Sequence, residues 1–239
     1  MAVEQAVGEP ITGISSMATR HVLAELAEVY ERQSGQRVAI ESVGGVDAAQ
    51  RVHAGEPFDF VVLAANAMDR LTEAGRVVPG QRIDFARSGV AIAVKTGAPS
   101  PDVASEAAVR AAVLGARSIG YSTGPSGVHL ARLFERWGIA ETIVPRVMQA
   151  PPGVPVATLV ARGDVELGFQ QLSEFLNVPG IHVVGSLPPE IQVTTVFSAA
   201  VCRAAKQPRA ATALLSFLDS PAADAAKRRH GMEPVRTGA

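Results

Sequence analysis

The sequence predicts a two-lobed α/β protein, and three observations lead to this fold class. Strand-like apolar runs alternate with helix-like patterns through most of the 239 residues, which is typical of parallel βαβ units. The hydrophobic fraction of 47% is enough for the core of one or two ordinary domains. Two strand-like runs, residues 90–94 and 191–201, lack a following helix of the usual kind. We therefore expect the chain to cross between two lobes at these runs.

Strands are predicted where short runs of the chain are apolar. The run 58–64 is apolar except for Asp59, as expected for a strand that is buried on both faces. The run 119–121 is shorter and leads directly into a polar loop. In chain order, the predicted strands are residues 11–14, 38–41, 58–64, 90–94, 119–121, 166–170, 181–184 and 191–201.

Helices are predicted where apolar residues recur at three- and four-residue spacing. Glycines 35, 55 and 75 follow such segments and favour a helix end, whereas Pro208 and Pro221 suit a first turn. The first helix opens at Ser15-Ser16 and ends near residue 35. The other predicted helices are residues 45–55, 66–74, 105–114, 155–162, 208–218 and 221–229. A further helix is predicted directly after the loop at residues 122–127.

Residues 118–137, SIGYSTGPSGVHLARLFERW, form the most informative segment. A short strand leads to a loop that contains Ser122, Thr123, Ser126 and Gly127, and this loop opens directly into a helix. First-turn N–H groups of a helix lack intrahelical partners, and the helix dipole favours negative charge there, so this order of elements predicts an anion site. The alternative is that Ser126 is only an N-cap in a turn.

Composition and charge exclude several classes of function. The net charge of −1, from 22 basic and 23 acidic residues, leaves no electrostatic footprint for nucleic acid or an anionic membrane. Cys202 is the only cysteine, so it can form neither an intrachain disulfide nor a cysteine-based zinc site. No segment approaches the roughly 18 apolar residues of a membrane span, and no signal-peptide core follows the N-terminus. As written, the chain is expected to be cytoplasmic, or periplasmic if a leader has been removed.

Polar loops follow the ends of several predicted strands. In α/β sheets, ligands bind beyond the carboxyl ends of the strands. Neutral donors that are fixed in place bind a desolvated anion well, so these loops predict a site for a small anion. Besides the loop 122–127, they contain Ser15-Ser16, Gly44-Gly45, residues 151–153 and Gln170-Gln171.

Six stretches, taken in order, carry a resemblance to a known family. They read GISSMATRHVLAELAEVYERQSG, VGGVDAAQRVHAGEPFDFVVLAA, SGVAIAVKTGAP, SIGYSTGPSGVHLARLFERWGI, LVARGDVELGFQQLSE and GMEPV. In this order they resemble the molybdate-binding-type periplasmic solute-binding proteins, over residues 11–235. The resemblance implies a type II periplasmic-binding-protein fold, with two lobes that each contain a mostly parallel sheet flanked by helices. Lobe 1 is expected at residues 1–88 and 196–239, lobe 2 at residues 89–195, and the ligand cleft between them.

The resemblance also implies site residues. Ser15 and Ser16 match the first anion-binding serine loop of the family, and Ser126 and Gly127 match its third loop. The second loop departs from the family pattern, because residues 45–47 replace a serine pair by Gly-Val-Asp.

Gln170 and Gln171 also depart, since they fall near a ligand-contacting tyrosine of the family. A lost hydroxyl and a nearby acidic Asp47 disfavour a bare oxyanion such as molybdate, whereas amides can donate to carboxylate oxygens. The departures therefore predict an organic di- or tricarboxylate. Arg20 and Arg87 are either carboxylate partners or ordinary surface arginines. The candidate ligand-binding residues are Ser15, Ser16, Arg20, Gly45, Arg87, Ser88, Ser122, Thr123, Ser126, Gly127, Gly153, Val154, Gln170 and Gln171.

Two functions are consistent with this pattern. The first is a non-catalytic binding protein that closes on a small anion, with an ABC transporter permease as partner if the chain is exported. The alternative is a cofactor-independent isomerase, similar in kind to aconitate isomerase, that shifts a double bond by proton transfer. Candidate bases are Asp47, His129 and Glu174. The sequence lacks the GK[ST] of a P-loop and the G-x-S-x-G of a nucleophile elbow, and its histidines lack metal-ligand spacing, so neither a metal nor another cofactor is expected.

Overall fold

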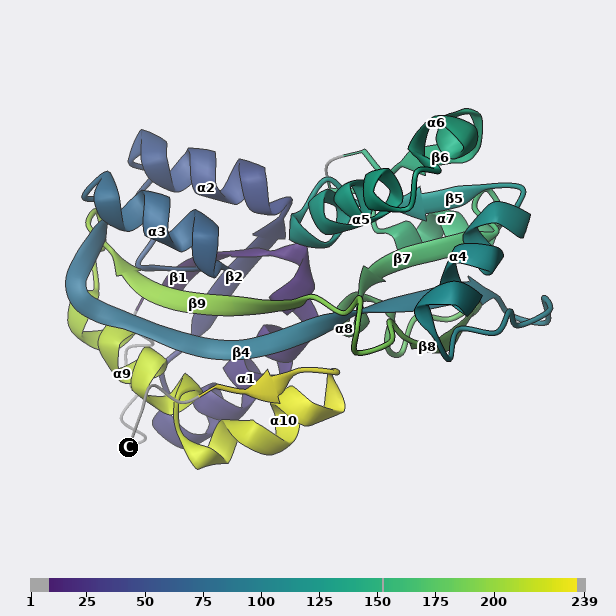
Figure 1. Cartoon of the computed structure of the whole chain (residues 1–239). Helices are drawn as coiled ribbons and strands as arrows, with labels where there is room; N and C mark the ends of the chain where they lie inside the picture. The colour runs from purple at the N-terminus through teal and green to yellow at the C-terminus, as the bar shows by residue number, and fades with distance from the viewer. Residues whose placement is uncertain (1–8, 152, 236–239) are drawn as a thin grey trace, which may run out of the picture. The chain divides into compact units, whose positions relative to one another are not determined.

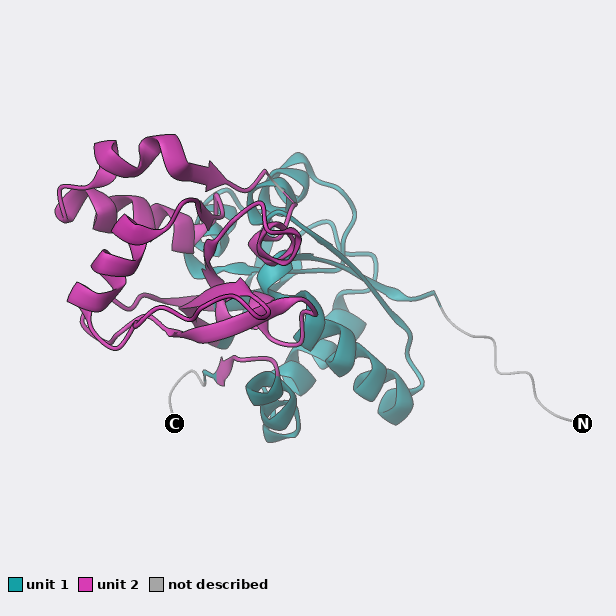
Figure 2. Cartoon of the chain, turned by 90° about the vertical axis from the view of Figure 1, so that its right-hand side faces the viewer, with its two compact units in different colours: residues 1–86, 197–229, 234–239 teal, residues 87–196, 230–233 magenta. Residues whose placement is uncertain are grey.

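A computed structural model describes residues 9–151 and 153–235 (Figure 1). The chain divides into two compact units, which Figure 2 shows in different colours. Unit 1 contains residues 1–86, 197–229 and 234–239, as far as these are described, and unit 2 contains Arg87–Val196 and His230–Glu233. Two strands, residues 77–95 and 194–202, each have one part in unit 1 and the other in unit 2.

The division differs in detail from the predicted lobes, because Arg87, Ser88, Val196 and residues 230–233 belong to unit 2 rather than to the first lobe. The short segment around Gly231 is attached to unit 2 by two contacts. The hydroxyl of Ser88 donates to the carbonyl oxygen of Gly231 at 3.1 Å. Gly231 also packs so closely on Leu172 and Leu176 that a Cβ at this position would lie within 2.9 Å of both side chains.

Unit 1 is built on a mixed sheet with the strand order β2-β1-β3-β9-β4. Strand β1 pairs in parallel with β2 and β3, and β9 pairs antiparallel with β3. Figure 1 shows α2 and α3 on one face of this sheet and α1, α9 and α10 on the other. The strands are β1 (Ile11–Ser16), β2 (Val38–Val43), β3 (Phe60–Ala64), β4 (Val77–Lys95), β9 (Thr194–Cys202) and the short β10 (Glu233–Pro234), which pairs with β4. The helices are η1 (Met17–Thr19), α1 (Arg20–Ser34), α2 (Gly45–Ala54), α3 (Ala65–Glu73), α9 (Pro208–Leu218), η3 (Pro221–Ala223) and α10 (Asp224–Arg229).

Unit 2 contains a second mixed sheet, with the order β4-β7-β5-β6 and with β8 on the other side of β4. Strands β5, β6 and β7 are mutually parallel in their pairings, whereas β4 is antiparallel to both β7 and β8. The strands are β5 (Ile119–Tyr121), β6 (Val147–Gln149), β7 (Leu167–Gln171) and β8 (Ile181–Ser186). The helices are α4 (Glu106–Gly115), α5 (Pro125–Arg136), α6 (Ala140–Ile143), η2 (Val144–Arg146), α7 (Val156–Arg162) and α8 (Leu172–Phe175).

Both faces of the unit 2 sheet are covered, because successive side chains of a strand point to opposite faces. In β4, Ile92 packs in a core cluster with Leu130 and Phe134 of α5. Its neighbours Ala91 and Ala93 belong to a different cluster, with Val156 and Val160 of α7. Two-sided burial explains why the second half of β4 reads as an unbroken apolar run.

The predicted α/β fold class is confirmed, and most predicted elements lie within two residues of their observed bounds. One prediction was too short: the strand at residues 90–94 is only the second part of the 19-residue β4. Its first part passes through Pro79 and Gly80 and is half-exposed, so it lacks the apolar run that identified the second part. Within the described ranges, none of the helices has the length and apolar character needed to cross a bilayer.

Candidate functional site

In unit 1, the end of β1 places two serines in different roles. Ser15 is fully buried, and its Oγ lies 2.8 Å from Oγ of Ser42 on β2. The Oγ of Ser16 is buried and has no hydrogen-bond partner among the described residues. A Cβ on Gly45 would lie 3.6 Å from Cβ of Ser16, so this serine adjoins the first turn of α2. An unpartnered hydroxyl beside unpaired helix N–H groups is suited to an anion.

The other unit 1 candidates surround this strand end. Asp47 is exposed in the first turn of α2, where its negative charge stabilises the helix N-terminus. Arg20 is exposed at the start of α1, and it lines a groove of about 320 Å³ together with Glu28, Glu31 and Ser42. The groove lies between α1 and β2, so Arg20 is placed near the partner of Ser15.

In unit 2, the loop after β5 is compact and ends in the first turn of α5. Oγ of Ser122 lies 3.4 Å from Oγ of Ser126 and accepts a hydrogen bond from the N–H of Gly124 at 3.4 Å. Gly124 is the N-cap of α5, and no side chain accepts a hydrogen bond there. The interpretation of Ser126 as an N-cap is therefore wrong: it is a buried first-turn residue of a helix with an uncapped N-terminus.

Gly127 is required by the close approach of the loop to the helix. A Cβ at this position would lie 1.6 Å from the carbonyl oxygen of Ser122, which is a severe clash with main chain. Strands β5 and β7 are parallel, with Tyr121 opposite Phe169, so the loop after β5 and the end of β7 lie at the same edge of the sheet.

The end of β7 carries Gln170 and Gln171, both of which are buried. Nε2 of Gln171 donates to Oγ1 of Thr195 at 2.8 Å, and Nε2 of Gln170 donates to Oε2 of Glu174 at 2.6 Å. The carbonyl oxygens of both amides are buried without a partner among the described residues. One hydrogen of each NH2 group is thus already used inside unit 2, which sequence reasoning did not anticipate.

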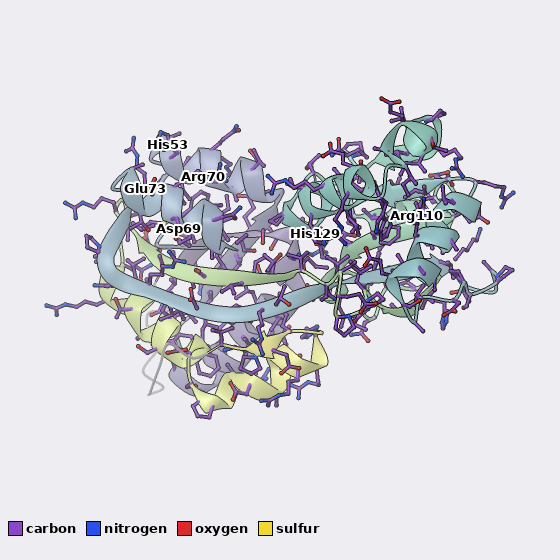
Figure 3. The ribbon with its side chains drawn as sticks, viewed as in Figure 1. His53, Asp69, Arg70, Glu73, Arg110 and His129 are labelled. Carbon is purple, nitrogen blue, oxygen red and sulfur yellow. The ribbon has the colours of Figure 1, made fainter. Side chains whose placement is uncertain are left out.

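Ser88 and His129 are held by contacts within unit 2. Oγ of Ser88 donates to Gly231 and accepts a long hydrogen bond of 3.5 Å from the N–H of Ser173, so this hydroxyl is engaged. Nε2 of His129, labelled in Figure 3, lies 2.9 Å from the carbonyl oxygen of Ile191. Its ring therefore anchors α5 to the chain that precedes β9.

The remaining candidates are less tightly placed. Arg87 and Thr123 are exposed. Gly153 adopts a φ of +77°, which glycine tolerates best, and Val154 closes a turn by donating its N–H to the carbonyl oxygen of Pro151 at 3.0 Å. Pro152, in the same predicted loop, lies outside the described residues. Within the described ranges, no group of three or more His, Cys, Asp or Glu side chains is placed to hold a metal ion.

Three polar partners were missing from the predicted set: Ser42, Ser173 and Thr195. The hydroxyl of Ser173 is buried without a partner among the described residues. Ser42 faces Ser15 because these residues are opposite each other in the parallel β1–β2 pairing. A register assigned between these strands in the sequence would have found Ser42, but no local pattern marks Ser173 or Thr195.

Glu174 is the candidate base that the structure distinguishes. Burial raises the pKa of this carboxyl from 4.5 to about 8, and the hydrogen bond from Gln170 offsets only part of that effect. Removal from water disfavours the charged form of a carboxyl. The proton of Glu174 is consequently exchangeable near neutral pH.

We expect Glu174→Gln to change the pH dependence of stability. Because the pKa in the folded state is above 4.5, the folded protein keeps a proton that the unfolded chain releases, and stability falls as pH rises between about 4.5 and 8. The amide removes this loss, which amounts to up to about 1.4 kcal/mol per pH unit. Urea unfolding of the wild type and of Glu174→Gln between these pH values measures the difference in the free energy of unfolding. Parallel pH profiles of the two proteins would contradict the raised pKa of Glu174.

Comparison with known proteins identifies the family of this chain and a curated relative. A model of the family described as bacterial extracellular solute-binding protein matches residues 11–233. A curated relative, aconitate isomerase of Pseudomonas sp, is 37% identical over 231 residues, which cover 94% of this chain and 88% of the relative.

Solved structures show the shared fold. The periplasmic molybdate-binding protein of Azotobacter vinelandii superposes with a TM-score of 0.80 at 19% identity, over 95% of this chain and 100% of that chain. The sulfate-binding protein of Mycobacterium tuberculosis H37Rv has a TM-score of 0.76 at 17% identity, over 95% of this chain and 88% of that chain. The predicted resemblance to molybdate-binding-type proteins is confirmed at the level of the fold.

Proposed function

The chain belongs to the bacterial extracellular solute-binding protein family, and from this premise we propose that it binds a small organic polycarboxylate. The observation that carries the proposal is the pair of neutral strand-end sites: Ser16 beside α2, and Ser126 in the uncapped first turn of α5. Neutral, fixed donors suit an anion that leaves water. The absence of a serine pair at residues 45–47 and the acidic Asp47 disfavour a small metal oxyanion.

The proposal assigns both sites to one ligand, as the family resemblance implies. In unit 1, the ligand contacts would come from the Ser15-Ser16 strand end, Arg20 and Gly45. In unit 2, they would come from Ser126, Gly127 and their neighbours. The other proposed contacts are those of Arg87, Ser88, Ser122, Thr123, Gly153, Val154, Gln170 and Gln171.

Thermal-shift screening tests the proposed ligand class. Ligand at about 100 times its Kd stabilises the folded state by about 2.7 kcal/mol, which corresponds to a rise in Tm of about 5–10 °C for a chain of this size. We expect such a rise with trans-aconitate, cis-aconitate or citrate, and none with molybdate, tungstate or sulfate. A response to molybdate alone would contradict the polycarboxylate proposal.

Ser16→Ala separates a binding role from a structural role. Its hydroxyl has no partner to lose, so we expect unchanged stability and an affinity about tenfold weaker, the value of one lost hydrogen bond. The comparison variant is Ser15→Ala, whose hydroxyl is already paired; this change leaves the Ser42 hydroxyl unpaired and should lower stability by about 1 kcal/mol. Calorimetric titration and urea unfolding of both variants measure the difference. Unchanged affinity in Ser16→Ala would remove Ser16 from the site.

A second candidate function is isomerisation of the bound polycarboxylate. The observation in its favour is the 37% identity to aconitate isomerase over nearly the whole chain. Incubation with trans-aconitate in heavy water tests it, since a proton shift would give cis-aconitate and deuterium in the recovered acids. Binding without deuterium uptake would leave the chain as a binding protein only.

A further inference from the structure

We propose that Glu174 is the acid–base residue that moves the proton in this isomerisation, with its carboxyl held by Gln170 at the end of β7. The inference rests on the second proposed function. The candidate bases are Asp47, His129 and Glu174, and they differ in their exposure to solvent and in their hydrogen bonds.

The position of Glu174 is set by the turn from β7 into α8. Glu174 follows Gln170 by four residues, and Oε2 of the carboxyl accepts the amide N–H of Gln170 at 2.6 Å. Gln170 is 2% exposed and is fixed in the sheet opposite Ala91 of β4. One carboxyl oxygen is thus anchored, while Oε1 has no hydrogen-bond partner within the described ranges. A base needs one such available oxygen in a fixed direction.

The residues around Glu174 leave three buried polar atoms unpaired among those described: Oε1 of Gln170, Oε1 of Gln171 and Oγ of Ser173. Buried polar atoms in folded proteins are almost always hydrogen-bonded. Three unpaired atoms within five residues therefore indicate that a hydrogen-bonding partner binds here. All three belong to one strand end and the helix that follows it. This concentration is what a site prepared for a polar ligand or its ordered water would show.

Gln170 can serve both protonation states of Glu174. The amide donates from its NH2 group to a carboxyl oxygen in the structure, and an amide can also accept from the O–H of a neutral carboxyl through its own oxygen. Turning the amide therefore keeps a hydrogen bond when Glu174 gains or loses a proton. A lysine or arginine in place of Gln170 could only donate, so it would stabilise the ionised form of Glu174 over the neutral form.

Burial brings the pKa of Glu174 to about 8, so both states are populated near neutral pH. Titratable groups on the segments that pack against α8 are His182 of β8, and His230 and Glu233 beside Gly231. The leading cause of the raised pKa is burial rather than any of these groups. General acid–base catalysis is most efficient when the catalytic pKa is near the working pH.

The two other candidate bases are less suitable. Asp47 is exposed on α2, so water rather than protein surrounds its carboxylate. The ring of His129 is engaged with the carbonyl oxygen of Ile191 at 2.9 Å. Glu174 combines partial burial with one anchored carboxyl oxygen and one that remains available.

The proton shift requires a single base and no other reactant. Glu174 takes a proton from the methylene carbon of the unsaturated acid, and the electron pair of the broken C–H bond forms a new double bond to the central carbon. The original double bond breaks, and its pair moves to the outer carbon, where the neighbouring carboxylate delocalises it. The same carboxyl returns the proton to that outer carbon. Atoms and electrons balance, because one C–H bond forms for the one that breaks.

Glu174→Gln tests the inference. The amide keeps the shape of the side chain and can still accept from Gln170, but it cannot take a proton. We expect deuterium uptake and isomerisation of trans-aconitate to fall at least about 100-fold, with the Kd for trans-aconitate within about threefold of wild type. Glu174→Asp should restore measurable exchange. The matched control is Glu141→Gln on α6, an exposed position where wild-type exchange is expected.

The outcomes separate this inference from the functions it rests on. Wild-type exchange that persists unchanged in Glu174→Gln overturns the role of Glu174 and leaves the isomerase function standing. Binding without exchange in the wild-type protein overturns both the isomerase function and this inference, but not polycarboxylate binding. Equal losses of Kd and exchange in Glu174→Gln, with a lowered Tm, would show a structural role and overturn the inference.

Discussion

Replacing Gly127 by alanine is expected to weaken polycarboxylate binding at least about tenfold while unit 1 stays folded. The new Cβ would lie 1.6 Å from the carbonyl oxygen of Ser122, and no rotation of a side chain relieves a clash with main chain. The strand before this oxygen is fixed, because the carbonyl of Tyr121 accepts the N–H of Ala150 at 2.9 Å. The first turn of α5 must therefore move and carry Ser126 with it. Each hydrogen bond that the displaced turn withdraws from the ligand costs about tenfold in affinity, and calorimetric titration with trans-aconitate measures the loss.

The same loop provides a matched control. A Cβ on Gly124 would lie 3.6 Å from Oγ of Ser122, an ordinary van der Waals contact, so Gly124→Ala should bind as the wild type does. Circular dichroism of both variants checks that the helices remain. Wild-type affinity in Gly127→Ala would exclude this loop from the ligand site.

The largest effect on stability is expected for Asp59→Asn. This carboxylate is 1% exposed and joins three segments of unit 1. Oδ2 accepts from the N–H and hydroxyl of Thr12 at 2.8 and 3.0 Å, and Oδ1 accepts from the N–H groups of Lys206 and Gln207 at 2.8 and 2.7 Å. An amide presents an NH2 group to one of these pairs of donors. We expect the free energy of unfolding to fall by about 3 kcal/mol or more, measured by urea unfolding.

Asp69→Asn controls for the same change at the surface. The side chain of Asp69 is 56% exposed and pairs with Arg82, so its replacement should cost less than about 1 kcal/mol. A cost below about 1 kcal/mol for Asp59→Asn as well would show that the four accepted hydrogen bonds do not hold these segments together.

Local patterns predicted most elements of the fold. The spacing of Leu130, Leu133 and Phe134 marked α5, and all three are buried as the pattern required. Gly35 and Gly55 mark helix ends with φ values of +72° and +88°, a conformation that glycine adopts without strain. The first part of β4 escaped prediction because a half-exposed strand with Pro79 and Gly80 has neither a continuous apolar run nor clean alternation.

The sequence predicted the strand-end residues of the site but not the long-range contacts that hold their side chains. Ser16, Ser126 and Gly127 stand at strand ends and helix starts, which a sequence displays directly. The engagement of Gln170 with Glu174, of Gln171 with Thr195 and of Ser88 with Gly231 depends on which strands pair and in which register. Residues 24 and 143 positions apart meet in the last two contacts, and no local periodicity encodes such distances.

The sequence by itself determined the α/β class, the order of strands and helices, and the strand-end loops that carry hydroxyls, because hydrophobic period and turn residues act over a few neighbours. Only the tertiary structure decided that β9 runs antiparallel to β3 and β4 antiparallel to β7 and β8, that residues 230–233 belong to unit 2, and that Ser126 lies in an uncapped first turn. It also decided that Glu174 is shielded enough to hold its proton near neutral pH. Burial and pairing arise from contacts between distant segments, and those contacts exist only once the chain has folded.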